Sequence, residues 1–134
     1  MIVVDTNIIS YFYLPTEKTA EVERLFLQTP EWAVPILWRS EFRNVLALYL
    51  RKGLLTFDQA FAIQSEAEML LSDKEFEVAS FDVLRLVEKS RCSAYDGEFV
   101  ALAMQLETVL VTADQKLIET FPKTAVALAD VLAE

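Results

Sequence analysis

The chain has 134 residues, and 54% of them are hydrophobic, which is enough for one sizeable core and excludes a disordered chain. The 12 basic and 21 acidic residues give a net charge of −9, which argues against nucleic-acid binding through a broad basic face. There is no histidine and only one cysteine, so the commonest general base is absent and a zinc site is not expected.

Targeting segments and cross-links are not expected either. No apolar run approaches the roughly 20 residues of a membrane span, and Met1 leads directly into a strand pattern without a basic leader. Cys92 has no partner for an intramolecular disulfide, which agrees with a reducing compartment. We therefore expect a single domain over residues 1–134, located in the cytoplasm and without a membrane contact.

The hydrophobic pattern predicts strands that alternate with helices. Strands are predicted at about 2–5, 31–35, 76–78, 109–112 and 124–127. Helices are predicted at about 7–13, 17–28, 37–51, 56–71, 80–91, 95–107 and 115–120, before a terminal turn. Thr16 and Thr56 are the expected N-caps of two helices, and Gly53 marks the end of a third. This alternation is typical of βαβ units, so we expect an α/β fold with a parallel sheet covered on both faces.

Two apolar runs each lead into an aspartate. The first is Ile2-Val3-Val4-Asp5, and the second is Val109-Leu110-Val111-Thr112-Ala113-Asp114. Continuous β-branched runs are typical of strands buried on both faces. In open α/β sheets, ligands bind at the carboxyl ends of the strands. Asp5 and Asp114 therefore stand where such folds carry out their chemistry.

Two further acids are predicted to face inward from helices. Glu41 lies four residues from both Leu37 and Val45, so its carboxylate borders an apolar face. Asp96 points in the same direction as Phe99, which lies three residues further along the predicted 95–107 helix. An inward carboxylate is costly unless it is paired, hydrogen-bonded or bound to a metal.

Two interpretations of these acids remain open. Each acid can act alone as a helix cap or as a favourable charge at a helix start, and Ser93 with Asp96 fits a capping box. Alternatively, Asp5, Glu41, Asp96 and Asp114 form one shared metal site in a chain that lacks histidine. Such a site would hold Mg²⁺ or Mn²⁺, because carboxylates bind hard cations. The cation would activate water for phosphodiester hydrolysis.

Four segments resemble the motifs of PIN-domain proteins. They are Val3-Val4-Asp5-Thr6-Asn7, Pro35-Ile36-Leu37-Trp38-Arg39-Ser40-Glu41-Phe42-Arg43-Asn44-Val45-Leu46, Ala94-Tyr95-Asp96-Gly97-Glu98-Phe99-Val100-Ala101-Leu102-Ala103 and Leu110-Val111-Thr112-Ala113-Asp114. They occur in the family's order and cover nearly the whole chain, and the third is the most specific. The size of the chain is similar to that of the VapC-type ribonuclease toxins of toxin–antitoxin pairs.

The resemblance implies a three-layer α/β/α sandwich with a five-stranded parallel sheet, and an endoribonuclease that depends on Mg²⁺ or Mn²⁺. It implies that Asp5, Glu41, Asp96 and Asp114 are the catalytic and metal-binding acids, and that Thr6, Asn7 and Thr112 support them. It also implies an RNA substrate, a cognate antitoxin and a homodimer, with the 17–28 and 37–71 helices as candidate contacts. Gly97 replaces the small alanine often found at its position, and we interpret Glu98 as solvated.

A basic stripe on the 37–51 helix also has two interpretations. Arg39, Arg43 and Arg51 are spaced by multiples of four and lie away from Glu41. The stripe is either a solvated face with ion pairs or a contact for RNA or an acidic partner. Trp32 and Trp38 flank the second strand, and we expect them to pack in a core or an interface rather than to stack on bases.

Three functions fit this sequence: a ribonuclease toxin, a housekeeping RNA-processing nuclease of the same family, and a non-catalytic interaction module that keeps the fold. The ribonuclease toxin is the leading hypothesis, because all four acids of the family are present. An aspartyl-nucleophile phosphatase is not expected, since Asn7 stands where a second aspartate would be required.

Overall fold

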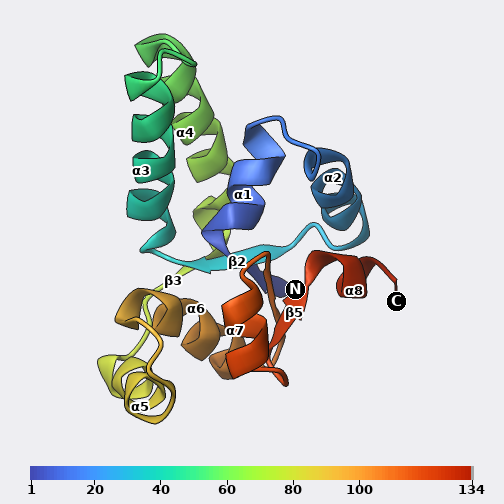
Figure 1. Cartoon of the computed structure of the whole chain (residues 1–134), viewed down its shortest axis with the longest axis vertical. Helices are drawn as coiled ribbons and strands as arrows, with labels where there is room; N and C mark the ends of the chain where they lie inside the picture. Colours follow the sequence, from blue (N-terminus) through green and yellow to red (C-terminus); the bar gives the residue numbers. More distant parts are fainter. Residues whose placement is uncertain (134) are drawn as a thin grey trace.

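Five parallel strands form a single sheet in the order β3-β2-β1-β4-β5 (Figure 1). The computed structural model describes residues 1–133, and its strands are β1 (Ile2–Val4), β2 (Trp32–Pro35), β3 (Glu75–Phe76), β4 (Leu110–Thr112) and β5 (Ala125–Ala127). Every neighbouring pair of strands is parallel. The prediction of a five-stranded parallel sheet is confirmed.

Helices cover both faces of the sheet, which gives the expected three layers. Above the sheet in Figure 1 lie α1 (Thr6–Tyr13), α2 (Thr19–Gln28), α3 (Trp38–Arg51) and α4 (Phe57–Leu71), with α8 (Leu128–Leu132) beside α2. Below it lie α5 (Ser80–Ser90), α6 (Ala94–Gln105) and α7 (Gln115–Thr120), and a short 3₁₀ turn, Ser72–Lys74, connects α4 to β3. Among the described helices, none combines the length and apolar composition needed to cross a bilayer.

The direction of the chain across the sheet reverses between β1 and β4. From β1 the chain proceeds to β2 and β3 on one side, and it later returns to β4 and β5 on the other. Val4 is aligned with Val111, and the amide of Asp5 donates to the carbonyl oxygen of Val111 at 3.0 Å. This register places Asp5 level with Thr112 at the carboxyl edge of the sheet. Open α/β sheets bind their ligands at such a switch point.

The core occupies both faces of the sheet. Trp32 and Trp38 are buried, which confirms that the two tryptophans pack inside rather than stack on bases. On the upper face, the Trp32 ring meets the rings of Phe12 and Phe26 edge to face, with centroid distances of 5.3 and 5.2 Å. On the lower face, α6 is buried around Phe99 and packs against the three central strands as well as α5. A helix that is apolar on most sides is stable only when it is covered in this way.

The start of α2 differs from the prediction. The helix begins at Thr19 with Lys18 as its N-cap, so the prediction that Thr16 caps it is wrong. The hydroxyl of Thr19 donates to the carbonyl oxygen of Tyr11 at 2.7 Å, which ties the first turn of α2 to α1. Thr16 therefore lies in the preceding turn, where its hydroxyl accepts from the Lys18 amide at 3.0 Å.

Two other boundaries are also shifted. β3 covers residues 75–76 instead of 76–78, because only Glu75 and Phe76 pair with β2. α6 ends at Gln105, two residues earlier than predicted. Glu107 has a left-handed φ of 54°, which is incompatible with a right-handed α-helix, so the helix does not extend to residue 107. The predicted range of α7 coincides with the observed helix.

The connection between α3 and α4 follows the predicted turn chemistry. Gly53 has a φ of 70°, and the amide of the next residue, Leu54, donates back to the carbonyl oxygen of Tyr49 at 2.9 Å. α4 then starts with a complete capping box. The hydroxyl of Thr56 accepts from the Gln59 amide at 3.2 Å, and the Gln59 side chain accepts from the Thr56 amide at 2.9 Å.

Replacing Gly53 by alanine should lower the free energy of unfolding by about 1–2 kcal/mol, because a positive φ is strained for a residue with a Cβ. No atom lies within 4 Å of the added Cβ, so the effect comes from the backbone alone. The measurement is urea unfolding followed by circular dichroism. Gly53→Asn is the control and should cost less, since asparagine tolerates this conformation. If Gly53→Ala is as stable as the parent protein, the positive φ at this position is not strained for alanine and the prediction is wrong.

Candidate active site at the carboxyl edge of the sheet

Asp5 directly follows β1, and its side chain is held from two elements. Only 8% of the residue is exposed. Its Oδ1 accepts a hydrogen bond from the Thr6 amide at 2.8 Å, so the carboxylate caps α1. Its Oδ2 accepts from the hydroxyl of Thr112 at 2.7 Å, across the boundary to β4, and Asn7 Nδ2 lies 3.5 Å from the same oxygen. These contacts fix the orientation of the carboxylate.

Thr112 and Asn7 connect the end of β1 to the turn after β4. The buried hydroxyl of Thr112 accepts from the Asp114 amide at 3.0 Å. Asn7 Oδ1 accepts from the Ala113 amide at 3.2 Å, and Asn7 Nδ2 lies 3.4 Å from the Thr112 hydroxyl. Two of the three residues that the sequence suggested as supports thus bond directly to the turn that carries Asp114.

Glu41 and Asp96 lie in the first turns of α3 and α6. Glu41 Oε1 accepts a hydrogen bond from the hydroxyl of Thr6 at 2.7 Å, which links α3 to the start of α1. The hydroxyl of Ser93 accepts from the Asp96 amide at 3.0 Å, so Ser93 is the N-cap of α6. The return bond from a side chain to the Ser93 amide, which would complete the predicted capping box, is absent from the described residues.

Asp114 is the N-cap of α7. Its Oδ1 accepts from the amides of Lys116 at 2.9 Å and Leu117 at 3.3 Å. Both bonds use the same oxygen, so Oδ2 is not occupied by the cap. The helix-cap interpretation is correct for Asp114, and also for Asp5. It does not exclude a shared site, because a capping carboxylate keeps lone pairs for another ligand.

The carboxyl groups act on one another electrostatically. Burial raises the pKa of Asp5, and the negative charges of Asp96 and Asp114 raise it further, while the hydrogen bonds from Thr112 and Thr6 oppose the increase. Burial also raises the pKa of Asp96, with the charge of Asp114 as the next cause. The structure therefore brings these acids into one electrostatic group.

Glu41 belongs to the same group and brings in a fifth acid. Burial raises the pKa of Glu41, the Thr6 hydroxyl opposes this, and the charges of Asp5, Asp96 and Glu98 add to it. Glu98 is itself half-buried, and burial raises its pKa. The prediction that Glu98 is solvated is wrong. Although its position lies about 200° from Asp96 around the helix, its carboxylate comes within electrostatic reach of Glu41.

The acids are near one another but do not form a finished ligand shell. In residues 1–133, no three Asp, Glu or Cys side chains converge closely enough to hold one ion by themselves. Any cation at this edge would therefore take few carboxylates directly and complete its shell with water, as Mg²⁺ commonly does.

The three arginines of the basic stripe have different surroundings. Arg39 forms a two-pronged ion pair with Glu75, at 2.6 and 2.7 Å, and a further bond to Glu68 at 3.0 Å. The bond from Arg39 is the main reason why the pKa of Glu75 is lowered. Arg39 thus fits the ion-pair interpretation, whereas Arg43 and Arg51 are exposed.

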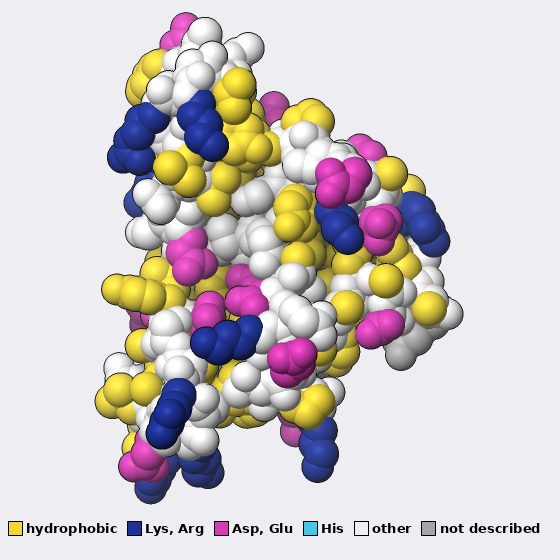
Figure 2. Space-filling view, viewed as in Figure 1, with side chains coloured by type: hydrophobic (Ala, Val, Ile, Leu, Met, Phe, Trp, Pro, Cys, Tyr) yellow, Lys and Arg dark blue, Asp and Glu magenta, His cyan; other side chains and the backbone are white. Residues whose placement is uncertain are grey.

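Two hollows border the acids, and Figure 2 shows acidic side chains gathered between the upper and lower helices with a basic side chain beside them. The tyrosine groove, about 400 Å³ between α1 and α3, is lined by Thr6, Asn7, Tyr11, Glu41, Val45 and Tyr49 among others. The basic hollow, about 560 Å³ beside α7 and the start of α6, is lined by Arg91, Ser93, Asp96, Asp114, Lys116 and Thr120 among others. Glu41 thus borders the first hollow and Asp96 and Asp114 border the second, and the charge of Asp96 acts on Glu41 between them.

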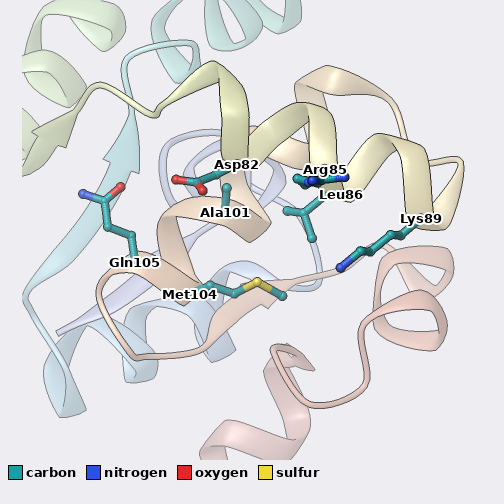
Figure 3. Close-up of a pocket in the computed structure, with 7 residues that line it drawn as sticks. All are labelled: Asp82, Arg85, Leu86, Lys89, Ala101, Met104 and Gln105. Carbon is teal, nitrogen blue, oxygen red and sulfur yellow. The ribbon is translucent and has the colours of Figure 1, made fainter.

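A further hollow of about 370 Å³ lies between α5 and α6 (Figure 3). It is lined by Asp82, Arg85, Leu86 and Lys89 from α5 and by Ala101, Met104 and Gln105 from α6. None of the predicted site residues contributes to it. It is therefore separate from the group of acids.

Tyr49 and Lys116 line the two hollows, although their sequence positions indicated no functional role. One available signal was the spacing of Glu41, Val45 and Tyr49, because residues four apart share one face of a helix. Lys116 stands two residues after Asp114, so a helix start at Asp114 already places both at the same end of α7.

Comparison with known proteins agrees with this geometry. The PIN domain family matches residues 2–122. The chain is similar to Ribonuclease VapC3 of Pyrobaculum aerophilum, with 32% identity over 126 residues that cover 90% of this chain and 95% of that protein.

Solved structures share the fold. The crystal structure of PAE2754 from Pyrobaculum aerophilum has a TM-score of 0.72 and 25% identity, covering 98% of this chain and 93% of that one. A toxin–antitoxin complex from Klebsiella pneumoniae has a TM-score of 0.67 and 14% identity, covering 96% and 98%, which is a likeness of fold alone. The chain therefore belongs to the PIN-domain family and is a relative of the VapC ribonucleases.

Proposed function

We propose that the protein is an endoribonuclease that uses Mg²⁺ or Mn²⁺ to hydrolyse RNA, and that it is the toxin of a toxin–antitoxin pair. The observation that carries the proposal is the electrostatic group of Asp5, Glu41, Asp96 and Asp114 at the switch point of the sheet. It is supported by the 32% identity to a protein named as a ribonuclease and by the shared fold of a toxin–antitoxin complex.

The side chains at this edge fit a hard divalent cation. They offer carboxylates, hydroxyls and the Asn7 amide, which are the donors that Mg²⁺ and Mn²⁺ accept. Asp5 is buried, and the charges that act on it in the described residues are negative. Ionised carboxylates in such a group repel one another, and a bound cation would remove that repulsion.

The roles of the side chains follow from their hydrogen bonds. A bound cation would activate a water molecule and neutralise charge on the scissile phosphate. Asp5, Asp96 and Asp114 would hold it, in part through water molecules of its shell, with Asp5 already oriented from two sides. Glu41 Oε1 is engaged by the Thr6 hydroxyl, so Oε2 is the atom that would accept the proton of the attacking water. Thr6, Asn7 and Thr112 act as positioning residues.

RNA cleavage should require Mg²⁺ or Mn²⁺ and stop in excess EDTA, because the chain has no histidine and its acids need a cation to act on phosphate. Asp96→Asn should reduce cleavage more than about 100-fold, since it removes a proposed ligand. Asp82→Asn, in the separate hollow of α5, is the control and should cleave normally. Fragments are resolved on gels. Cleavage that persists in EDTA would rule out metal dependence, and no cleavage with either metal would favour the non-catalytic module.

Asp5→Asn should abolish cleavage and raise the melting temperature of the metal-free protein at neutral pH. Burial raises the pKa of Asp5 in the folded state above its ordinary value of 3.8. The stability that its proton contributes is therefore complete below that ordinary value and is lost as the pH rises through the folded pKa. The neutral amide avoids this loss. The gain should shrink as the pH falls through the raised pKa of Asp5, because Asp5 itself then takes up a proton. Thermal scans in EDTA across this range test the idea, and a gain independent of pH would contradict it.

We further propose that the antitoxin blocks the site by placing an Arg or Lys side chain beside Asp5 and Asp96. An acidic chain with a net charge of −9 attracts a cationic segment more readily than a polyanion. Asp5 is buried and Asp96 is half-buried, so the ion pair would be partly desolvated and stronger than a surface pair.

Replacing that basic residue of the antitoxin by glutamine should weaken inhibition more than about tenfold, because a desolvated charge loses its partner. The measurement is the antitoxin concentration that halves RNA cleavage, with a glutamine substitution at an exposed basic residue of the antitoxin as the control. Equal inhibition by all variants would show that the block lies elsewhere. A nuclease with no inhibitory partner would favour the housekeeping function.

We also propose that the protein forms a homodimer through the upper helices. Large apolar side chains are exposed on α2, on α3, on α4 and in the turn between the last two: Leu27, Leu48, Leu54, Phe57, Phe61 and Met69. The rings of Phe57 and Phe61 stack on each other, with centroids 6.0 Å apart, although both residues are more than 60% exposed. Exposed apolar side chains that contact each other, as Phe57 and Phe61 do, are typical of a contact site.

The cytoplasmic location expected from the sequence stays a prediction.

A further inference from the structure

The two hollows that meet at the acids differ in chemistry. In the tyrosine groove, the rings of Tyr11 and Tyr49 and the apolar Leu14 and Val45 stand among uncharged polar side chains, and no Lys or Arg lines it in the described residues. In the basic hollow, Arg91 and Lys116 stand with the hydroxyl groups of serine and threonine side chains. A polymer that crosses the acids therefore meets an aromatic surface on one side and a cationic surface on the other.

The tyrosine groove runs away from the acids along α3. Glu41, Val45 and Tyr49 are four residues apart and line the groove together. Val45 and Tyr49 therefore lie roughly 6 and 12 Å from Glu41 along the helix axis. From the opposite wall, α1 contributes Asn7 beside the acids and Tyr11 one turn further along. Both tyrosines are half-buried, so their rings form part of the groove wall.

The basic hollow brings positive charge to the other side. Lys116 lies in the first turn of α7, and its charge lowers the pKa of Asp96 against the stronger effect of burial. Its ammonium group is therefore within electrostatic reach of the acids. Arg91 follows α5 and is exposed at the rim of the same hollow. These two side chains can neutralise a phosphate that lies next to the scissile one.

We infer that a single RNA strand crosses the site through both hollows, with a backbone phosphate beside Lys116 and an unpaired nucleobase stacked against Tyr49 in the tyrosine groove. The inference rests on the proposed ribonuclease function and assigns two contacts with its substrate, one to Tyr49 and one to Lys116. A nucleobase is uncharged and has a flat π-face, so it suits a groove with tyrosines and no cations. A phosphate would be repelled there by Glu41, the one charged side chain among the described lining residues. The basic hollow has the opposite character and suits the backbone.

The test compares two probes that differ only in their bases: a fluorescein-labelled oligoadenylate and an abasic ribose-phosphate oligomer of the same length. Binding is measured by anisotropy with Mg²⁺, in an Asp5→Asn background that prevents turnover. The parent protein should bind oligoadenylate more tightly, and Tyr49→Ala should reduce this preference about tenfold. That factor corresponds to roughly 1.4 kcal/mol, within the range of base–aromatic stacking. Tyr49→Phe should keep the preference.

Lys116→Gln provides the complementary result. It should weaken the binding of both probes by the same factor and lower the salt dependence of binding by about one phosphate contact. Leu50→Ala is the matched control for Tyr49, because Leu50 is its exposed neighbour on α3 and does not line the groove. It should change neither probe. A Tyr49→Ala protein that merely folds poorly would lose both probes equally, so the ratio of the two affinities isolates the base contact.

Equal binding of the two probes by the parent protein, or an unchanged preference in Tyr49→Ala, overturns the inference. If Tyr49→Ala instead weakens only the binding of the antitoxin, the groove is a protein-docking surface and the inference is wrong. Failure of the proposed function has a different signature. In that case the wild-type protein would cleave no RNA with Mg²⁺ or Mn²⁺, whereas the preference for oligoadenylate would be present and would be lost in Tyr49→Ala. This combination would support the path of the strand and reject the nuclease function.

Discussion

The hydrogen bond from the Thr112 hydroxyl to the buried carboxylate of Asp5 joins the fold to the candidate site. A buried carboxylate without partners would be costly, so the strand end at Asp5 needs the donors that β4 and α1 supply. The same hydroxyl accepts a hydrogen bond from the amide of Asp114, the residue that caps α7. The register of β1 and β4 aligns Val4 with Val111, so Asp5 lies level with Thr112. The contacts of the Thr112 hydroxyl thus connect the central strand pair to both acids.

Helix capping and metal binding, which the sequence left as alternatives, are compatible in this structure. Asp5 and Asp114 cap α1 and α7, and Asp96 lies in the first turn of α6. A helix N-terminus carries a partial positive charge, which offsets part of the repulsion among the acids. The backbone amides that need a cap also orient the carboxylates. A cluster of acids can therefore persist without a cation, with a stability that depends on pH.

The sequence was sufficient for the local features of the fold and insufficient for contacts between distant segments. Buried β-branched runs identified β1 and β4, and the Gly53 turn was readable from local chemistry. Which strands are neighbours was not predicted, since hydrophobic periodicity carries no information on strand order. The ion pair of Arg39 with Glu75 spans 36 positions and has no local signal. Glu98 was misjudged because a helical angle ignores the reach of a long side chain.

The acidic composition of the chain restricts how it can bind RNA rather than whether it can. A net charge of −9 leaves no broad basic face, so affinity has to come from local features: a bound cation, a few basic side chains such as Lys116, and base stacking. Few phosphate contacts imply a shallow salt dependence. Stacking requires bases that are unpaired, which excludes the interior of a duplex. The same acidic site favours a cationic inhibitor, so the charge that limits the substrate also selects the partner.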